Sequence, residues 1–294
     1  MPQCALCHKE NDLKESHIFP KFVSHWIKKT GLTDGLRRFD NVNKRHQDGI
    51  KEKLLCEECE QRFSKSEKLF AENIFKPYLE EDKTEFDYSS WLNYFISSVN
   101  WRVMYCELID CLNGENEILP HNFEMLSHTA VALEKYLLEK STFPGTITNH
   151  LYFFDISLLI PLADFNPVSF LKRSFFGWVV EGEHCLYVYS NLCGILLITI
   201  LKSLPVDQWV NTQIMEKGRI KSTNQLALSP IPGDIFNLIQ ECGKERLSEN
   251  QTMKLLEKIK ADEARVINSK FLEEYGKDLD MKDYLNSLSK KQQK

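Results

Sequence analysis

The sequence predicts an α+β protein in which a small zinc-stapled module precedes a larger domain of helices and antiparallel strands. Three observations support this prediction: two C-x-x-C pairs near the N-terminus, a central stretch with aromatic residues at helical spacing, and a later stretch of short apolar runs divided by turn residues. We place the module at residues 1–80. The mixed helical and β-meander domain, with a helical C-terminus, is placed at residues 81–294.

The module is predicted from its cysteines. Two pairs of thiolates suit the tetrahedral coordination of one zinc ion, and the expected ligands are Cys4, Cys7, Cys56 and Cys59. Three histidines near the pairs are alternative ligands: His8, His25 and His46. A module this short gains much of its folding energy from metal binding, so zinc is expected as a structural cofactor.

The composition limits the class of protein. The chain has 294 residues, a net charge of -5 and 43% hydrophobic residues, which is typical of a globular protein. Its nine cysteines are an odd number, and the N-terminus lacks a charged region followed by an apolar run, so we expect a reducing, cytoplasmic setting. The longest apolar run, residues 195–201, is far shorter than the roughly twenty residues that span a bilayer, so no membrane segment is expected.

Helices are expected after the second cysteine pair. Apolar residues near helical spacing predict one helix over residues 61–77, ended by Pro77. The same spacing predicts an antiparallel helical pair over residues 88–110 and 122–140, joined by a connector that contains Gly and Pro. Their wide aromatic stripe is expected to be core rather than a cofactor site.

Strands are expected next in the chain. Apolar runs separated by turn residues predict an antiparallel meander that packs against the helical pair, with strands at residues 151–154, 170–180, 185–189 and 195–201. Helices return beyond residue 233, and Ser248 with Gln251 is typical of a capping box.

Basic side chains gather between the two cysteine pairs. Residues 20–53 hold nine Lys and Arg against four Asp and Glu, an excess of +5 in a chain whose net charge is negative. Such a field can dock a phosphate backbone. It can equally offset the negative charge of a zinc-tetrathiolate centre. Both interpretations use the same charges, and the sequence favours neither.

The order of motifs in the module resembles that of the HNH endonuclease family. The motifs are Cys4-x-x-Cys7, then Ser16-His17-Ile18-Phe19-Pro20, then Leu54-Leu55-Cys56-x-x-Cys59-Glu60. This resemblance covers roughly residues 1–75. The chain is also similar to a set of uncharacterised bacterial proteins in which Ser-His-Ile-x-Pro-Lys, Gln-Asp-Gly-x-Lys and Leu-Leu-Cys-x-x-Cys-Glu occur together. The resemblance implies a treble-clef ββα-metal finger.

The resemblance also implies a set of catalytic roles. His17 matches the general base that takes a proton from the attacking water, a role that suits an imidazole titrating near neutrality. Glu60 matches a ligand of a catalytic Mg or Mn ion, and Asp48 is a further candidate ligand. The expected substrate-binding residues are Lys21, Arg45 and Lys51.

The sequence departs from the family pattern at three positions. Ser16 replaces an acidic residue or histidine that binds the metal, and Glu60 replaces a final histidine or asparagine. Lys51 replaces the asparagine that orients the base, a role that Asp48 takes only if the loop geometry allows. Glu67, seven residues after Glu60, is expected on nearly the same helical face. The structural alternatives are a buried histidine at position 17 and a helix-dipole contact at Glu60.

Two functions follow from the sequence. The first is a metal-dependent endonuclease that cleaves phosphodiester bonds, suited to bacterial antiviral defence, in which residues 81–294 position nucleic acid or bind a partner. The second is a catalytically silent, zinc-stabilised module that binds nucleic acid or protein. A protein partner or a homo-oligomer fits either function. Motifs of serine hydrolases, P-loop enzymes and zinc proteases are absent.

Overall fold

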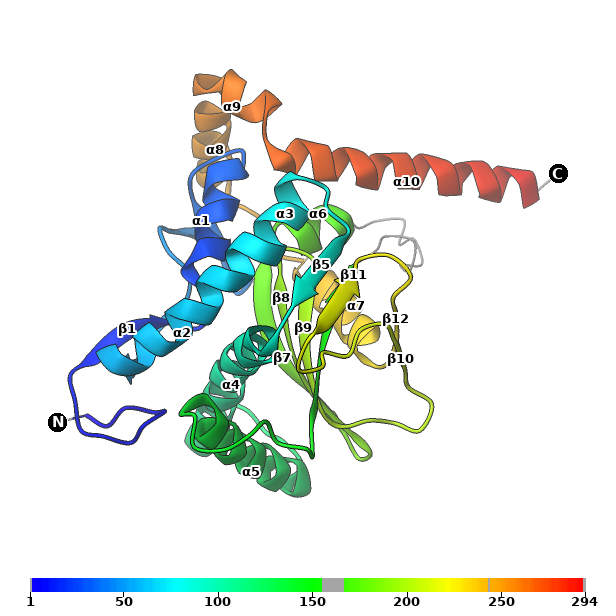
Figure 1. The fold of residues 1–294 in the computed structure, drawn as a ribbon. Coiled ribbons are helices and arrows are strands. Elements are labelled where there is room, and N and C mark those ends of the chain that lie inside the picture. The colour runs from blue at the N-terminus through cyan, green and yellow to red at the C-terminus, as the bar shows by residue number, and fades with distance from the viewer. Residues whose placement is uncertain (1, 155–166, 243, 293–294) are drawn as a thin grey trace.

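A computed structural model describes residues 2–154, 167–242 and 244–292 and confirms the α+β class (Figure 1). A four-stranded antiparallel sheet forms the centre of the molecule, and a long helix, α4, packs across it. The segments that carry the cysteine pairs lie to one side of the sheet, and the C-terminal helix α10 points away from the body on the other.

A small sheet and a helix carry the predicted module. β1 (Leu13–His17) and β4 (Lys51–Cys56) pair antiparallel, so that Leu13 lies opposite Cys56 and His17 opposite Lys51. α2 (Glu57–Phe70) begins directly after β4 and contacts both strands. The long connection between the two strands contains α1 (Lys21–Thr30) and a hairpin of β2 (Leu36–Arg38) and β3 (Asn41–His46).

The helix after the second cysteine pair continues past the predicted end. α2 passes into a π-helical turn, η1 (Ala71–Phe75), and then into α3 (Lys76–Glu80). The prediction that Pro77 ends the helix is wrong. A proline is tolerated in the first turn of a helix, where its missing N–H has no partner to lose, and Pro77 is the second residue of α3.

The antiparallel helical pair is present, formed by α4 (Ser90–Asn113) and α5 (Pro120–Leu137). Nearly every side chain of residues 92–104 is buried, because α4 contacts the sheet as well as α2 and α5. This explains the width of its apolar stripe and confirms that the stripe is core.

The central sheet has the strand order β6-β9-β8-β7. Its strands are β6 (Thr148–Phe153), β7 (Phe175–Gly182), β8 (Cys185–Leu192) and β9 (Ile195–Lys202). β7, β8 and β9 form a meander, but β6 pairs with β9 instead of β7, so the prediction of a meander of all four strands is wrong. The prediction of a strand from residue 170 is wrong at its start, because Pro167–Lys172 forms helix α6.

Short strands and four helices complete the fold. β5 (Glu85–Tyr88) pairs with β11 (Gly218–Lys221), and β10 (Gln208–Val210) pairs with β12 (Leu226–Leu228). The helices are α7 (Ile231–Cys242), α8 (Glu249–Ala261), α9 (Glu263–Ile267) and α10 (Lys270–Gln292). The Ser248 side chain accepts a hydrogen bond from the Gln251 amide, as expected of a cap. Within the described ranges, no helix combines the length and apolarity needed to cross a membrane.

The largest buried cluster spans the predicted domain boundary. It joins Leu55 and Phe63 of the module to Trp101 of α4 and Leu186 of the sheet. A smaller cluster on the other face of the sheet packs against α7 through Ile235 and its neighbours. Packing is therefore continuous across residue 80, and the division into two domains stays a prediction.

Candidate metal centre and candidate active site

The four predicted cysteines meet at one point. Their sulfur atoms all lie within 4.8 Å of one another, and Cys7 Sγ is 3.8 Å from Cys56 Sγ. A tetrahedral zinc ion with Zn–S bonds of about 2.3 Å sets sulfur atoms about 3.8 Å apart, so the donor set fits zinc. Among the residues that the structure describes, this is the one group of three or more Cys, His, Asp or Glu side chains placed to hold an ion.

Backbone contacts fix the cysteine cluster. Cys4 and Cys7 come from the turn before β1, whereas Cys56 ends β4 and Cys59 lies in the first turn of α2. The Cys56 amide donates to Cys4 Sγ at 3.3 Å, and the His8 amide donates to the Cys4 carbonyl at 2.9 Å. Such outer contacts orient metal ligands.

The alternative histidine ligands lie outside the cluster. The His8 ring reaches Glu134 on α5 instead, with Nε2 2.9 Å from Oε2. His25 is exposed on α1, and His46 lies on β3. The set of four cysteines is therefore the arrangement that the fold assembles.

The thiol groups of the cluster differ in acidity. Burial raises the pKa of the Cys7 and Cys59 thiols, and at Cys59 repulsion from the neighbouring Cys4 thiolate adds to the effect. At Cys4, burial alone would raise the pKa, but hydrogen bonds from the backbone of Cys7 and Cys56 lower it. A bound cation favours the thiolate form of all four, so metal binding and deprotonation are coupled.

The predicted base, His17, stands at the end of β1 beside a carboxylate. Its Nε2 is 3.1 Å from Asp48 Oδ1, and Lys51 Nζ is 2.7 Å from Asp48 Oδ2. The His17 ring is not aligned for a straight hydrogen bond, so the contact is a close approach of the imidazole to the carboxylate. The His17 side chain is 17% exposed, which leaves it within reach of a ligand at the surface.

Asp48 lies in the loop before β4 and is held there from several sides. Its carboxylate accepts the Gly49 amide at 3.0 Å and the Ser24 hydroxyl at 3.4 Å. Partial burial alone would raise the pKa of Asp48, but hydrogen bonds from Lys51 and Gly49 and the nearby His17 ring together hold it well below its usual range. The loop therefore places an ionised carboxylate where it can orient the His17 ring.

A buried arginine supports His17 from behind. Arg102 of α4 is 2% exposed, and its Nη1 donates to the His17 carbonyl at 2.7 Å. Its Nη2 donates to Glu67 of α2 at 2.8 Å, and its Nε donates to the Ser98 carbonyl at 3.1 Å. The guanidinium also lies 5.2 Å from the centre of the Phe63 ring. Sequence reasoning missed Arg102 because it lies in a core helix far along the chain.

Two other predicted residues, Glu60 and Ser16, are at least partly buried. Glu60 is in the first turn of α2, and its Oε1 is buried without a hydrogen-bond partner. The acidic residue of α2 that Arg102 links to His17 is Glu67. Ser16 is buried, and its hydroxyl accepts the Leu55 amide at 3.1 Å, so it is an internal contact.

The three predicted substrate-binding residues belong to different elements. Lys51 pairs with Asp48, whereas Arg45 of β3 pairs with Asp34, and Lys21 is the first residue of α1. Asp48 and Glu60 are not joined with a third ligand among the described residues, so the catalytic Mg or Mn ion stays a prediction.

Comparison with models of known families, with curated proteins and with solved structures finds no match for this chain.

Proposed function

We propose that the protein is an HNH-type endonuclease that hydrolyses phosphodiester bonds in nucleic acid, with the four-cysteine zinc site as its structural staple. One observation supports this proposal above the others: a partly exposed imidazole, His17, lies 3.1 Å from an ionised carboxylate, Asp48, at the edge of a basic segment. A histidine oriented by a carboxylate is the usual form of a general base.

The close approach of His17 to Asp48 supports one tautomer of the base. Because Nε2 of His17 faces the Asp48 carboxylate, the ring proton belongs on Nε2, and Nδ1 is left to take the proton of an attacking water. The hydroxide then attacks phosphorus, and the P–O bond to the leaving oxygen breaks. Asp48 stabilises the imidazolium that forms.

The requirement for Mg or Mn enters this proposal through the family resemblance. The carboxylate of Asp48 is already engaged by His17, Lys51 and Gly49. Because Asp48, Glu60 and a third ligand are not assembled in the described part of the chain, the proposed base step uses His17 and Asp48 alone.

A cleavage assay tests the proposal. Labelled single-stranded and duplex DNA and RNA are incubated with protein in added Mg or Mn, or with no added divalent ion, because a chelator would also remove zinc. We expect His17→Ala to lower the rate by about 10² or more, the usual contribution of a general base, and Asp48→Asn to lower it less. His184→Ala, at an exposed histidine in the β7–β8 turn, serves as the control. Absence of cleavage by wild type with every ion, or equal cleavage by His17→Ala, refutes the proposal.

The silent binding module is the second candidate, and one observation favours it. Apart from the cysteine cluster, the described residues form no group of three side chains suited to a metal. On this alternative the protein binds nucleic acid or a protein partner with zinc present but leaves every phosphodiester bond intact. Binding without cleavage in the same assay would select it.

A further inference from the structure

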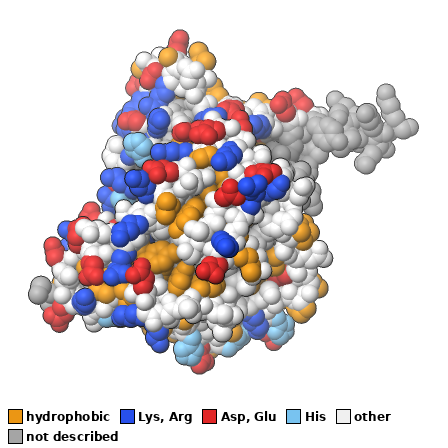
Figure 2. Space-filling model, in the orientation of Figure 1, with side chains coloured by type: hydrophobic (Ala, Val, Ile, Leu, Met, Phe, Trp, Pro, Cys, Tyr) orange, Lys and Arg blue, Asp and Glu red, His pale blue; other side chains and the backbone are white. Residues whose placement is uncertain are grey.

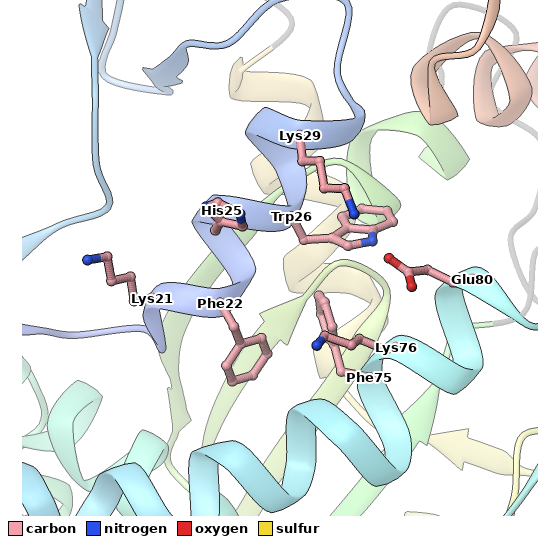
Figure 3. Close-up of a pocket in the computed structure, with 8 residues that line it drawn as sticks. All are labelled: Lys21, Phe22, His25, Trp26, Lys29, Phe75, Lys76 and Glu80. Carbon is pink, nitrogen blue, oxygen red and sulfur yellow. The ribbon is translucent and has the colours of Figure 1, made fainter.

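A groove of about 390 Å³ lies between α1 and the helical segment where η1 passes into α3 (Figure 3). It begins at Lys21, whose carbonyl accepts the Ser24 hydroxyl that also contacts Asp48, and extends to Lys29 along the same helix. Lys76 and Glu80 line its other wall. The groove therefore starts next to the proposed site and runs away from it.

The rim of the groove is basic. Lys21, Lys29 and Lys76 are exposed, and none of them has an ion-pair partner within 4 Å among the described residues. Glu80 is the acidic residue of the lining. Figure 2 shows Lys and Arg side chains gathered at the upper left, where α1 lies in Figure 1, beside an apolar area. Lysines without partners favour an anionic ligand.

The floor of the groove is aromatic and carries an unused hydrogen-bond donor. Phe22, Trp26 and Phe75 line it. Trp26 is 6% exposed, and its Nε1 is buried with no hydrogen-bond partner. Figure 3 shows the indole turned from α1 toward the side where Glu80 lies. A buried N–H without an acceptor is unfavourable, so a ligand that brings an acceptor would be stabilised there.

The α1 wall of the groove is held in place without a ligand. Arg173 donates to the Ile27 carbonyl at 2.8 Å and Arg265 to the Gly31 carbonyl at 2.9 Å, so arginines satisfy the C-terminal end of α1. The Arg173 guanidinium also lies 4.9 Å from the centre of the Trp26 ring and covers it. The opposite wall includes Phe75, the last residue of η1, and π-helical turns are frequent at functional sites.

We propose that this groove binds one unpaired nucleotide of a single-stranded nucleic acid. The lysines bind phosphates, the base lies against Phe22, and Trp26 Nε1 donates to an acceptor on the nucleotide. The volume is within the range of small-ligand sites. A duplex offers no unpaired base to an aromatic floor. This inference rests on the proposed function, since it names the strand on which His17 would act.

Binding is measured by fluorescence anisotropy with labelled oligo-dT and oligo-U, in buffer without added divalent ion. We expect Lys29→Ala/Lys76→Ala to weaken binding tenfold or more near 0.1 M salt. The slope of log K against log salt should fall by about 1.4, since each phosphate contact on a single strand contributes about 0.7. Trp26→Phe keeps the ring and removes the donor, so we expect roughly five-fold weaker binding with an unchanged slope.

A matched control separates the groove from net charge. Lys135→Ala/Lys217→Ala removes the same charge from exposed lysines on α5 and before β11, and should bind like wild type. Circular dichroism and zinc content verify that each variant is folded. Competition with duplex DNA, a mononucleotide and inorganic phosphate shows which part of the ligand is recognised.

The outcomes distinguish this inference from the proposed nuclease. If duplex competes as well as single strand, if wild type binds no oligonucleotide, or if the groove variants bind like the control, the groove proposal is overturned, whatever the cleavage assay shows. If the groove variants lose single-strand binding while wild type cuts nothing, the groove proposal holds and the nuclease proposal fails.

Discussion

At the scale of single residues, the buried side chain of Arg102 is held by hydrogen bonds on three sides. Its guanidinium is buried and bridges β1, α2 and its own helix through the His17 carbonyl, Glu67 and Ser98. Breaking a buried ion pair leaves an uncompensated charge, which typically destabilises a protein by 3–5 kcal/mol.

We therefore expect Arg102→Met to lower the free energy of unfolding by about 3 kcal/mol, measured by urea denaturation. Arg102→Met combined with Glu67→Leu should recover part of this loss, because the double variant leaves no carboxylate without its partner. Arg219→Met, at an exposed ion pair with Asp87, is the control and should change stability little. A double variant no more stable than the single one would show that Glu67 is not the group left unpaired.

His150 gives the fold a pH dependence of a defined sign. Burial lowers its pKa to about 4, whereas a histidine in an unfolded chain titrates near 6.5. The unfolded state therefore binds more protons between these values, and the free energy of unfolding falls as pH falls from about 6.5 to about 4. We expect this group to remove roughly 2 kcal/mol between pH 7 and pH 5.

His150→Gln isolates this contribution, because glutamine does not titrate and can still bond the hydroxyls of Thr148 and Thr212 that contact the ring. Urea unfolding of both proteins at pH 7 and pH 5 gives the comparison. If the variant loses as much stability as wild type on acidification, another group is responsible. The comparison also cancels any effect of acid on the zinc site.

Sequence patterns predicted individual residues well where the chemistry is local. The C-x-x-C spacing indicated all four cysteines, because each pair closes its own turn. The contact of Asp48 with His17 was left open, since it depends on the path of a loop. Arg102 was missed, because an arginine within an apolar helix shows its partners only after the helices have packed.

At the scale of elements, the cysteine cluster joins the turn before β1 to the end of β4 and the first turn of α2. We expect one zinc per chain by elemental analysis of protein purified without chelator. Cys59→Ser should lose the metal and the ordered contacts of β1, β4 and α2, because metal binding supplies folding energy. Hydrogen exchange of these segments provides the measurement.

Cys111→Ser is the control, since Cys111 lies on α4 outside the cluster. Wild-type protein with less than one zinc per chain, or Cys59→Ser protein with unchanged zinc content, would contradict the assignment.

Element prediction failed where distant residues decide the conformation. The apolar pair at residues 170–171 is short, and periodicity does not separate a short strand from a helix. In the structure it belongs to α6, whose Val168 and Ser169 amides both donate to the carboxylate of Asp278 on α10 at 2.9 Å. That cap comes from the other end of the chain and is invisible locally.

At the scale of the whole molecule, positive charge is concentrated in one region. The net charge is negative, yet basic residues gather between the cysteine pairs, including on α1. The uneven charge is visible in the sequence, but the sequence does not decide whether it docks phosphate or offsets a zinc-tetrathiolate centre. Whole-fold class was predictable because it depends on periodicity, whereas the packing of the module onto α4 depends on shape and contacts that no single segment encodes.

The continuous core links the cysteine cluster to the central sheet. Phe63 of α2 packs against Trp101 of α4, with ring centres 6.3 Å apart, and α4 contacts the central sheet. A disturbance at the cysteine cluster can therefore pass through side-chain contacts to strands that share no ligand with it. We expect the metal-bound chain to unfold in one cooperative transition, because the cysteine cluster and the central sheet share this core.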